Sequence, residues 1–244
     1  MRKINVGILK PGSAPEKLAA IQGDYDARFR AMLGEDAFAF ATYDIENGVF
    51  PESATAADAW IITGSRHGVY EDHPWIAPLE QLIRDIQVTG RPLVGICFGH
   101  QIVAQALGGR VERAATGWIA GPRRYRSAEG NSFFANAWHR DQVVGLPPEA
   151  EIIATGDGCP AAGLRYRGPI LTLQAHPEFD TDYFLGLLAE RGGALPEGQF
   201  ETVRDNAHRC TLDLDYLARL LRDMLKAAPA HGAGAANDAE SPDL

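Results

Sequence analysis

The sequence predicts an α/β protein in which an open, mainly parallel sheet carries helices on both faces, giving three layers. Three observations predict this fold. Short apolar runs of strand length recur along the chain, stretches with helical spacing separate the early runs, and 244 residues fit one domain of this class. The runs are continuous rather than alternating, as expected for parallel strands that are buried on both faces.

The individual elements follow from apolar spacing and from turn residues. The runs that predict strands cover residues 4–9, 38–43, 57–63, 92–96, 151–154, 163–166 and 169–174. Helical spacing predicts helices over residues 15–33, 74–88, 98–107 and 213–226. In the second helix Ile76, Leu79, Ile83 and Ile86 form one stripe, and Pro74 suits a first helical position. Residues 110–148 are richer in glycine, polar and aromatic residues, so we expect short strands and loops folded over one edge of the sheet.

No internal repeat and no second domain is evident in the sequence. We expect a single domain over residues 1–226. The tail, residues 227–244, is rich in Ala, Gly, Pro and Asp, and we expect it to be disordered because it has little apolar surface to offset its ordering entropy.

Composition excludes several functional classes. Hydrophobic residues make up 45% and charged residues 23% of the chain, which is ordinary for a globular domain. The formal net charge of −9 argues against a nucleic-acid partner, which would require a basic face. No apolar run approaches the ~20 residues that cross a bilayer, so we expect no membrane partner.

Cysteine and histidine usage bears on location and on metals. The three cysteines, at positions 97, 159 and 210, suit a reducing compartment, and the N-terminal residues lead directly into a strand without an apolar leader. We therefore expect a cytoplasmic protein. The chain has neither a Cys-x-x-Cys pair nor a His-Glu-x-x-His motif, so we expect no metal and no cofactor. The remaining histidines fit surface positions better than ligand positions: His67, His73, His208 and His231.

The most informative motif is Gly95-Ile96-Cys97-Phe98-Gly99-His100-Gln101. It places Cys97 at a strand-to-helix turn, with glycines two residues before and two residues after it, which is the pattern of a nucleophile elbow. Glycines allow a sharp turn and a close approach of neighbouring backbone. A helix N-terminus beside the sulfur favours the reactive thiolate. A buried, inert cysteine is the alternative interpretation of this motif alone.

A second motif lies at the end of the strand over residues 169–174, in Gln174-Ala175-His176-Pro177-Glu178-Phe179. Pro177 favours an extended conformation at His176, and in extended chain the side chains at i and i+2 project to the same side. Glu178 can therefore orient the His176 imidazole. Together with Cys97 these are the parts of a thiol triad. A loop with a solvated carboxylate would explain this motif alone, but two such motifs at strand ends favour catalysis.

These motifs resemble those of the class I glutamine amidotransferase family, and the similarity extends over residues 3 to about 184. Residues 61–65, Ile-Ile-Thr-Gly-Ser, lie where that family has its oxyanion strand. The resemblance implies the flavodoxin-like fold of the family and a Cys97, His176, Glu178 triad. It also implies an oxyanion hole made of backbone N–H groups from Phe98 and from Ser65 or Gly64.

The resemblance further implies how a substrate would be held. Gln101 lies one helical turn after Cys97 and would contact the glutamyl head group, while a surface position is the alternative. His139 and Asp141 match a His-x-Asp segment of the family, which implies contact with the glutamyl group or shaping of the site lip. Trp118 and the residues after it could line a leaving-group pocket or an exposed loop. His100 points away from Gln101 around the helix and is interpreted as structural.

One departure from the family pattern bears on function. Synthetase-linked members have Ser-Gly-Gly-Pro at the oxyanion strand, where this chain has Thr63-Gly64-Ser65-Arg66. That form resembles the free-standing GMP synthase-like branch, which includes γ-glutamyl peptidases. We therefore expect a cysteine hydrolase that cleaves the γ-glutamyl amide bond of glutamine or of a γ-glutamyl peptide through a Cys97 thioester. The alternatives are a glutaminase subunit that delivers ammonia to a separate synthetase, and a non-catalytic regulatory module of the same fold.

Overall fold

The computed structural model describes residues 2–227 of the chain. Its main element is a nine-stranded sheet in the order β2-β1-β3-β4-β11-β10-β9-β6-β7. The first five strands in that order are parallel. They are β2 (Phe38–Asp44), β1 (Ile4–Lys10), β3 (Ala59–Ile62), β4 (Leu93–Ile96) and β11 (Ile170–Leu173). We call these five strands the parallel half of the sheet.

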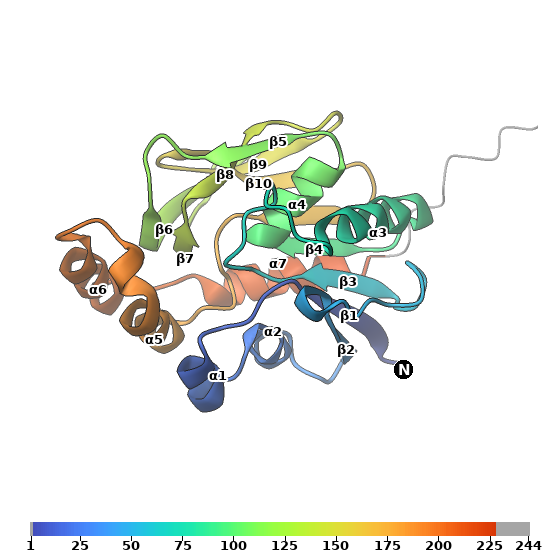
Figure 1. Cartoon of the computed structure of the whole chain (residues 1–244), viewed down its shortest axis with the longest axis horizontal. Coiled ribbons are helices and arrows are strands. Elements are labelled where there is room, and N and C mark those ends of the chain that lie inside the picture. Colours follow the sequence, from blue (N-terminus) through green and yellow to red (C-terminus); the bar gives the residue numbers. More distant parts are fainter. Residues whose placement is uncertain (1, 228–244) are drawn as a thin grey trace, which may run out of the picture.

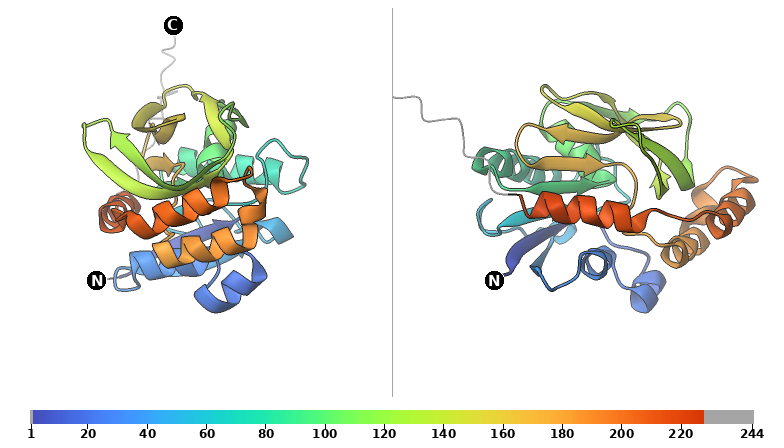
Figure 2. Two further views of the ribbon diagram at one scale, coloured as in Figure 1. Left: turned by 90° about the vertical axis from the view of Figure 1, so that its left-hand side faces the viewer. Right: turned by 180° about the vertical axis from the view of Figure 1, so that it is seen from behind.

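The other four strands continue the same sheet in antiparallel pairing, and we call them the antiparallel half. They are β10 (Cys159–Tyr166), β9 (Glu151–Gly156), β6 (Ile119–Ser127) and β7 (Ser132–His139). A separate antiparallel pair joins β5 (Arg110–Arg113) to β8 (Asp141–Gly145). Figure 2 shows this half curling over the rest of the molecule.

The expectation of short strands and loops over residues 110–148 was wrong in part. The strands β6 and β7 have 9 and 8 residues, and both belong to the main sheet. Four of the nine residues of β6 are exposed or half-buried, so its sequence lacks the continuous apolar run that marks a strand buried on both faces. The positive φ of +85° at Gly121 also interrupts the strand pattern.

Helices cover both faces of the parallel half, which confirms the predicted three-layer α/β fold (Figure 1). One face carries α3 (Ile76–Thr89) and α4 (Phe98–Ala106), and the other carries α2 (Tyr25–Leu33) and α7 (Leu214–Leu225). The predicted stripe on α3 is buried as expected. That helix begins at Ile76 rather than at Pro74.

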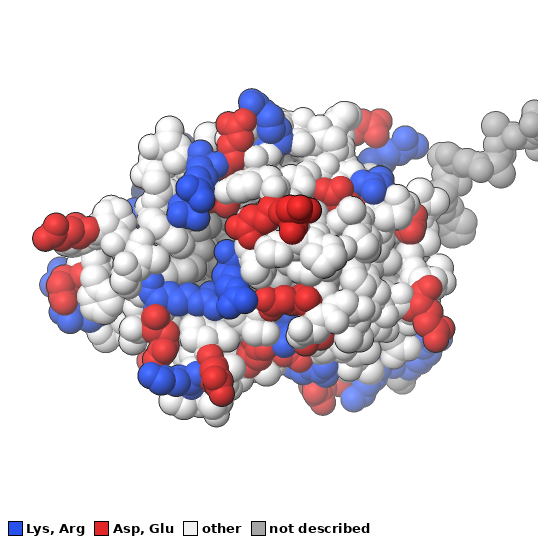
Figure 3. Space-filling model, viewed as in Figure 1, with Lys and Arg blue, Asp and Glu red and all other residues white. Residues whose placement is uncertain are grey.

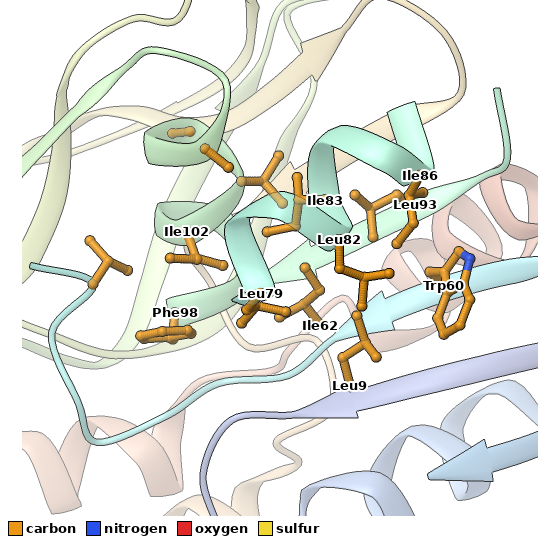
Figure 4. Close-up of a cluster of buried hydrophobic side chains, with 14 of the residues drawn as sticks. Leu9, Trp60, Ile62, Leu79, Leu82, Ile83, Ile86, Leu93, Phe98 and Ile102 are labelled. Carbon is orange, nitrogen blue, oxygen red and sulfur yellow. The ribbon is translucent and has the colours of Figure 1, made fainter. Parts of the chain in front are cut away.

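Alternation along the strands divides the core between the two faces. Val6 and Ile8 of β1 pack toward α2 and α7, whereas Leu9 packs toward α3. Figure 4 shows the apolar side chains that pack between the sheet and α3, with Leu9 and Trp60 beneath the apolar face of that helix. A Cβ at Gly7 would lie 2.3 Å from the Trp60 ring, so β1 needs glycine there to accommodate the indole.

The predicted helix over residues 15–33 is divided in two. It forms α1 (Glu16–Gln22) and α2, which are separated by Gly23 at φ +85° and by Asp24, whose side chain accepts a hydrogen bond from the Tyr25 N–H. Glycine in this conformation ends a helix and aspartate begins the next one. The remaining helical segments are α5 (Thr181–Arg191), α6 (Gln199–Arg209) and the short 3-10 turns η1 (Ile45–Asn47) and η2 (Gly192–Ala194).

Residues of α1, α5 and α6 form a third apolar cluster at one end of the sheet. No helix within residues 2–227 is long and apolar enough to cross a bilayer. The predicted tail lies outside the described residues except for Ala227.

Candidate active site

Three loops meet where parallel strands end. Gly64, Cys97 and His176 follow β3, β4 and β11, which are neighbours in the sheet and end at the same edge. A Cβ placed on Gly64 would lie 3.1 Å from Cε1 of His176 and 3.8 Å from Cβ of Cys97. The topology therefore brings the thiol and the imidazole together, at the edge where open parallel sheets bind their ligands.

Cys97 occupies a strained elbow between β4 and α4. Its φ of +53° and ψ of −102° fall in a region that a residue with a side chain rarely adopts. The flanking glycines make room for this turn. A Cβ at Gly95 would lie 2.5 Å from the carbonyl oxygen of Gly99, and one at Gly99 would lie 2.3 Å from the carbonyl oxygen of Ile62. Both approaches are to backbone atoms, which cannot easily move.

His176 and Glu178 form a buried pair. Nδ1 of His176 lies 2.7 Å from Oε1 of Glu178, and both side chains are almost fully inaccessible. Burial alone would lower the pKa of His176, but the Glu178 carboxylate and the Cys97 sulfur outweigh it and raise the pKa to about 10. The imidazole is thus held in its protonated form when both neighbours are charged.

The antiparallel half holds the His176 segment in place. The His176 N–H donates to the carbonyl of Asn136 at 2.9 Å, and the Asn136 side-chain amide donates to the carbonyl of Phe179 at 3.0 Å. The Phe179 ring stacks on the imidazole with a centroid separation of 4.1 Å. Nε2 of His176 has no hydrogen-bond partner within residues 2–227. The imidazole is oriented at Nδ1, and the Cys97 side chain lies close enough to help raise the His176 pKa.

The backbone N–H groups expected to form the oxyanion hole belong to residues that follow β3 and β4, beside Cys97 and His176. The Phe98 N–H is in the first turn of α4, where a backbone N–H has no intrahelical acceptor. Ser65 is fixed by its hydroxyl, which donates to the carbonyl of Pro11 at 2.9 Å and accepts from the His67 N–H at 3.2 Å. Gly64 and Ser65 therefore lie in a segment anchored on the loop after β1.

The expected substrate contacts are also brought together. Gln101 is buried, and its side-chain amide donates to the carbonyl of Asp141 at 2.8 Å and to the side chain of Gln174 at 3.1 Å. Nδ1 of His139 lies 3.3 Å from the same Asp141 carbonyl oxygen. Burial and the nearby His176 lower the pKa of His139 to about 3, so this imidazole is neutral. The Asp141 carboxylate accepts from the Tyr70 hydroxyl at 3.0 Å.

Six of the predicted site residues line one cavity of about 330 Å³, namely Ser65, Cys97, Gln101, His139, Asp141 and His176. Phe98, Gly64 and Glu178 do not line it. Figure 3 shows basic side chains around the hollow left of centre. The rest of its wall includes Trp138, Arg140 and Phe179, which belong to the sequence motifs, and residues that no motif indicated, namely Tyr25, Leu187, Arg191 and Ala194. Trp118 and Arg66 line it as well, whereas Tyr70 is half exposed and touches only Asp141 among these groups. The residues from α2 and α5 carry no local motif, so only the fold could reveal them.

The other cysteines and histidines fall into two groups. Cys159 is buried and Cys210 is partly exposed, and neither lines the cavity. His100 is fully buried, with Nδ1 2.8 Å from the Thr172 hydroxyl, which agrees with a structural role. His73 is partly exposed, as expected for a surface position, but His67 is less exposed than expected. The His67 side chain is only 15% exposed and lines the cavity, and both imidazoles contact Glu71. His231 lies outside the described residues.

Comparisons with known proteins agree with this arrangement. The model of the family described as glutamine amidotransferase class-I matches residues 43–184, which is more than half of the chain. Gamma-glutamyl peptidase 4 of Arabidopsis thaliana is 26% identical over 226 residues, covering 85% of this chain and 90% of that protein. A glutamine-hydrolyzing GMP synthase of Cupriavidus necator is 35% identical over 141 residues, covering 50% of this chain and 25% of that enzyme.

The fold has a counterpart among solved structures. A glutamine amidotransferase from Thermotoga maritima superimposes with a TM-score of 0.74 at 22% identity, and the match covers 93% of this chain and 100% of that one. At this identity the match speaks for the fold alone. The family model and the match to most of gamma-glutamyl peptidase 4 support a class I glutamine amidotransferase-like hydrolase. The chain therefore belongs to the class-I glutamine amidotransferase family, as the resemblance of its motifs predicted.

Proposed function

We propose that this protein hydrolyses the γ-glutamyl amide bond of glutamine or of a γ-glutamyl peptide, with Cys97, His176 and Glu178 as a catalytic triad. The observation that carries the proposal is the geometry at the sheet edge. Cys97 lies on a strained elbow beside His176, whose other nitrogen is held 2.7 Å from Glu178. A nucleophile, a base and a group that orients the base are the parts that covalent acyl transfer requires.

In the first step His176 takes the thiol proton and the Cys97 sulfur attacks the γ-carbonyl carbon. The carbonyl oxygen becomes negative and accepts hydrogen bonds from the Phe98 N–H and from the N–H of Ser65 or Gly64. Donors aimed at such an oxygen stabilise the transition state, and removing one costs roughly 3 kcal/mol. His176 then gives its proton to the departing ammonia or amine, the C–N bond breaks, and a glutamyl thioester remains on Cys97.

In the second step water hydrolyses the thioester. His176 accepts a proton from the water as its oxygen attacks the thioester carbon, the C–S bond breaks, and glutamate and the free thiol are released. Glu178 stabilises the imidazolium in both steps. The high pKa of His176 supports this role, since the carboxylate that raises it is the one that holds the ring.

We assign substrate binding to Gln101, His139 and Asp141. All three residues line the cavity, and the side chains of Gln101 and His139 both contact the backbone carbonyl of Asp141. These polar groups suit the α-amino and α-carboxyl groups of a glutamyl moiety. Beyond them the cavity continues to Trp118, Arg140 and Arg191. An aromatic and basic wall suits a leaving group larger than ammonia that carries a carboxylate, which favours γ-glutamyl peptides over glutamine.

The test is the release of amine or ammonia by the purified protein alone, from glutamine and from γ-glutamyl peptides including glutathione. We expect turnover that favours the peptides and that disappears in Cys97→Ser. Cys210→Ser is the matched control because this thiol lies outside the cavity, and we expect it to retain full activity. Cleavage that survives in Cys97→Ser would refute the proposed mechanism.

The second candidate is a glutaminase subunit that delivers ammonia to a separate synthetase. The match to 25% of a GMP synthase favours it, because that enzyme is described as glutamine-hydrolyzing. This candidate predicts turnover of glutamine rather than peptides, or no turnover until a partner is added. The same assay therefore separates the two functions.

A further inference from the structure

Outside the proposed triad, one cluster of side chains combines metal-ligand chemistry with a suitable geometry. His67, Glu71 and His73 lie in the loop between β3 and α3, and one ligand atom from each lies within 4.8 Å of the other two. Oε2 of Glu71 is 3.2 Å from Nδ1 of His67 and 2.9 Å from Nε2 of His73. An ion with bonds of about 2.0–2.2 Å holds neighbouring ligand atoms about 3–3.6 Å apart, so small side-chain movements would complete a three-ligand site.

The surroundings of the cluster orient its imidazoles. Nε2 of His67 lies 3.0 Å from Oε1 of Glu46, and Glu46 also pairs with Arg66 at 3.1 Å. A carboxylate on the far nitrogen fixes the proton there and turns the other nitrogen into a ligand, as is usual for histidines that bind metals. Binding of an ion displaces any proton from Nδ1.

His73 is fixed by packing. Its ring stacks on Trp75 with a centroid separation of 5.4 Å and an interplanar angle of 6°, and it meets the His67 ring edge-on at 4.2 Å. This leaves its Nε2 directed at Glu71. Two of the three ligand side chains are therefore ordered before an ion arrives, which reduces the entropy cost of binding.

We propose that His67, Glu71 and His73 bind one divalent transition-metal ion of the zinc class, with a further position open to water. Two imidazole nitrogens and one carboxylate oxygen suit Zn²⁺, Co²⁺ or Ni²⁺, whereas Mg²⁺ and Ca²⁺ prefer oxygen ligands. The site borders the cavity through His67, which follows Ser65 by two residues. A bound ion would cross-link the loop that carries Ser65.

Calorimetric titration of chelator-treated protein with Zn²⁺ tests the proposal. The titration uses Cys97→Ala protein, so that the active-site thiol cannot act as a ligand. We expect one ion per chain and a rise in the melting temperature on binding, since an ion that binds the folded state stabilises it. Loss of a ligand in His73→Gln or Glu71→Gln should weaken binding by at least tenfold, and Glu46→Gln should weaken it by roughly 10–100-fold.

His208→Gln is the matched control because His208 is an exposed histidine on α6, remote from the loop, and binding should be unchanged. Titration with Co²⁺ provides a second readout, because thiolate ligation by Cys159 or Cys210 would add an intense near-ultraviolet band. Absence of saturable Zn²⁺ binding, a thiolate band, or equal affinity in His73→Gln and His208→Gln would overturn the proposal.

Discussion

The two halves of the sheet contribute different things to the cavity. The parallel half supplies Cys97, His176 and the Gly64–Ser65 segment from three neighbouring strand ends. The antiparallel half supplies Asn136, which holds the His176 segment, together with cavity-wall residues such as Trp138 and His139. The difference suggests that the reacting groups reside on the parallel half, while the antiparallel half orients them and shapes the space that a substrate fills.

Glycine substitutions should give the largest difference in stability between the two halves of the sheet. In the parallel half, a Cβ in Gly99→Ala would lie 2.3 Å from a backbone oxygen of β3. Backbone cannot yield, so we expect a loss of about 3 kcal/mol or more in the free energy of unfolding, together with loss of activity. In the antiparallel half, Gly163→Ala meets only side-chain atoms, at 3.0 Å or more, and should cost about 1 kcal/mol. Urea unfolding of both variants measures this contrast, and equal losses would contradict it.

Within the proposed triad, Glu178→Gln should reduce kcat/KM by roughly 10²–10⁴-fold, because the imidazole loses its orienting charge. It should also change the pH dependence. The pKa of His176 is raised from 6.5 to about 10, so its stabilising contribution is present below pH 6.5 and is lost as the pH rises through about 10.

Without the Glu178 charge the pKa of His176 should fall. The pH range over which His176 stabilises the fold should then narrow, and the alkaline limb of kcat/KM should move to lower pH. Paired pH profiles of activity and of urea unfolding for the wild type and the variant measure both effects. An unchanged alkaline limb would mean that Glu178 does not control the protonation of His176.

A positioning residue of the antiparallel half should have a smaller effect. Asn136→Ala removes the hydrogen bond to the Phe179 carbonyl, so the His176 segment loses one of its restraints. We expect kcat to fall about tenfold with little change in KM, since the substrate contacts remain. Asn131→Ala, at the exposed β6–β7 turn, is the matched control and should match the wild type. A rise in KM without a fall in kcat would place Asn136 in substrate binding instead.

The same division explains how much the sequence could predict. The parallel strands are continuous apolar runs, and the Gly-x-Cys-x-Gly and His-Pro-Glu motifs directly follow two of them, so the fold class and the convergence of Cys97 with His176 could be predicted locally. In the antiparallel half, β6 is partly exposed and interrupted by Gly121, and β7 is largely buried but contains the polar residues Asn136 and His139, so neither strand shows a continuous apolar run. Gly23 and Asp24 did carry a helix-break signal, but the apolar spacing over residues 15–33 obscured it.

Residues that depend on tertiary packing could not be predicted. Arg191 and Leu187 line the cavity because α5 packs against α1 and α6, and no sequence motif in α5 indicates this position. The same holds for the contact between Glu46 and His67, which are 21 positions apart.

Acid stability offers a further comparison, between one buried histidine from each half. Burial lowers the pKa of His100, beside β11, to about 3, and burial with the nearby His176 does the same for His139 on β7. Below pH 6.5 the unfolded chain binds a proton at each position while the folded chain does not. The free energy of unfolding should therefore fall as the pH drops from 6.5 toward 3, by up to about 1.4 kcal/mol per pH unit for each group.

Urea titrations between pH 7 and 4 should give a shallower slope of unfolding free energy against pH for both His100→Gln and His139→Gln. Because only His139 lines the cavity, only its variant should also raise KM, and a KM change in His100→Gln would show that α4 transmits strain to the substrate site.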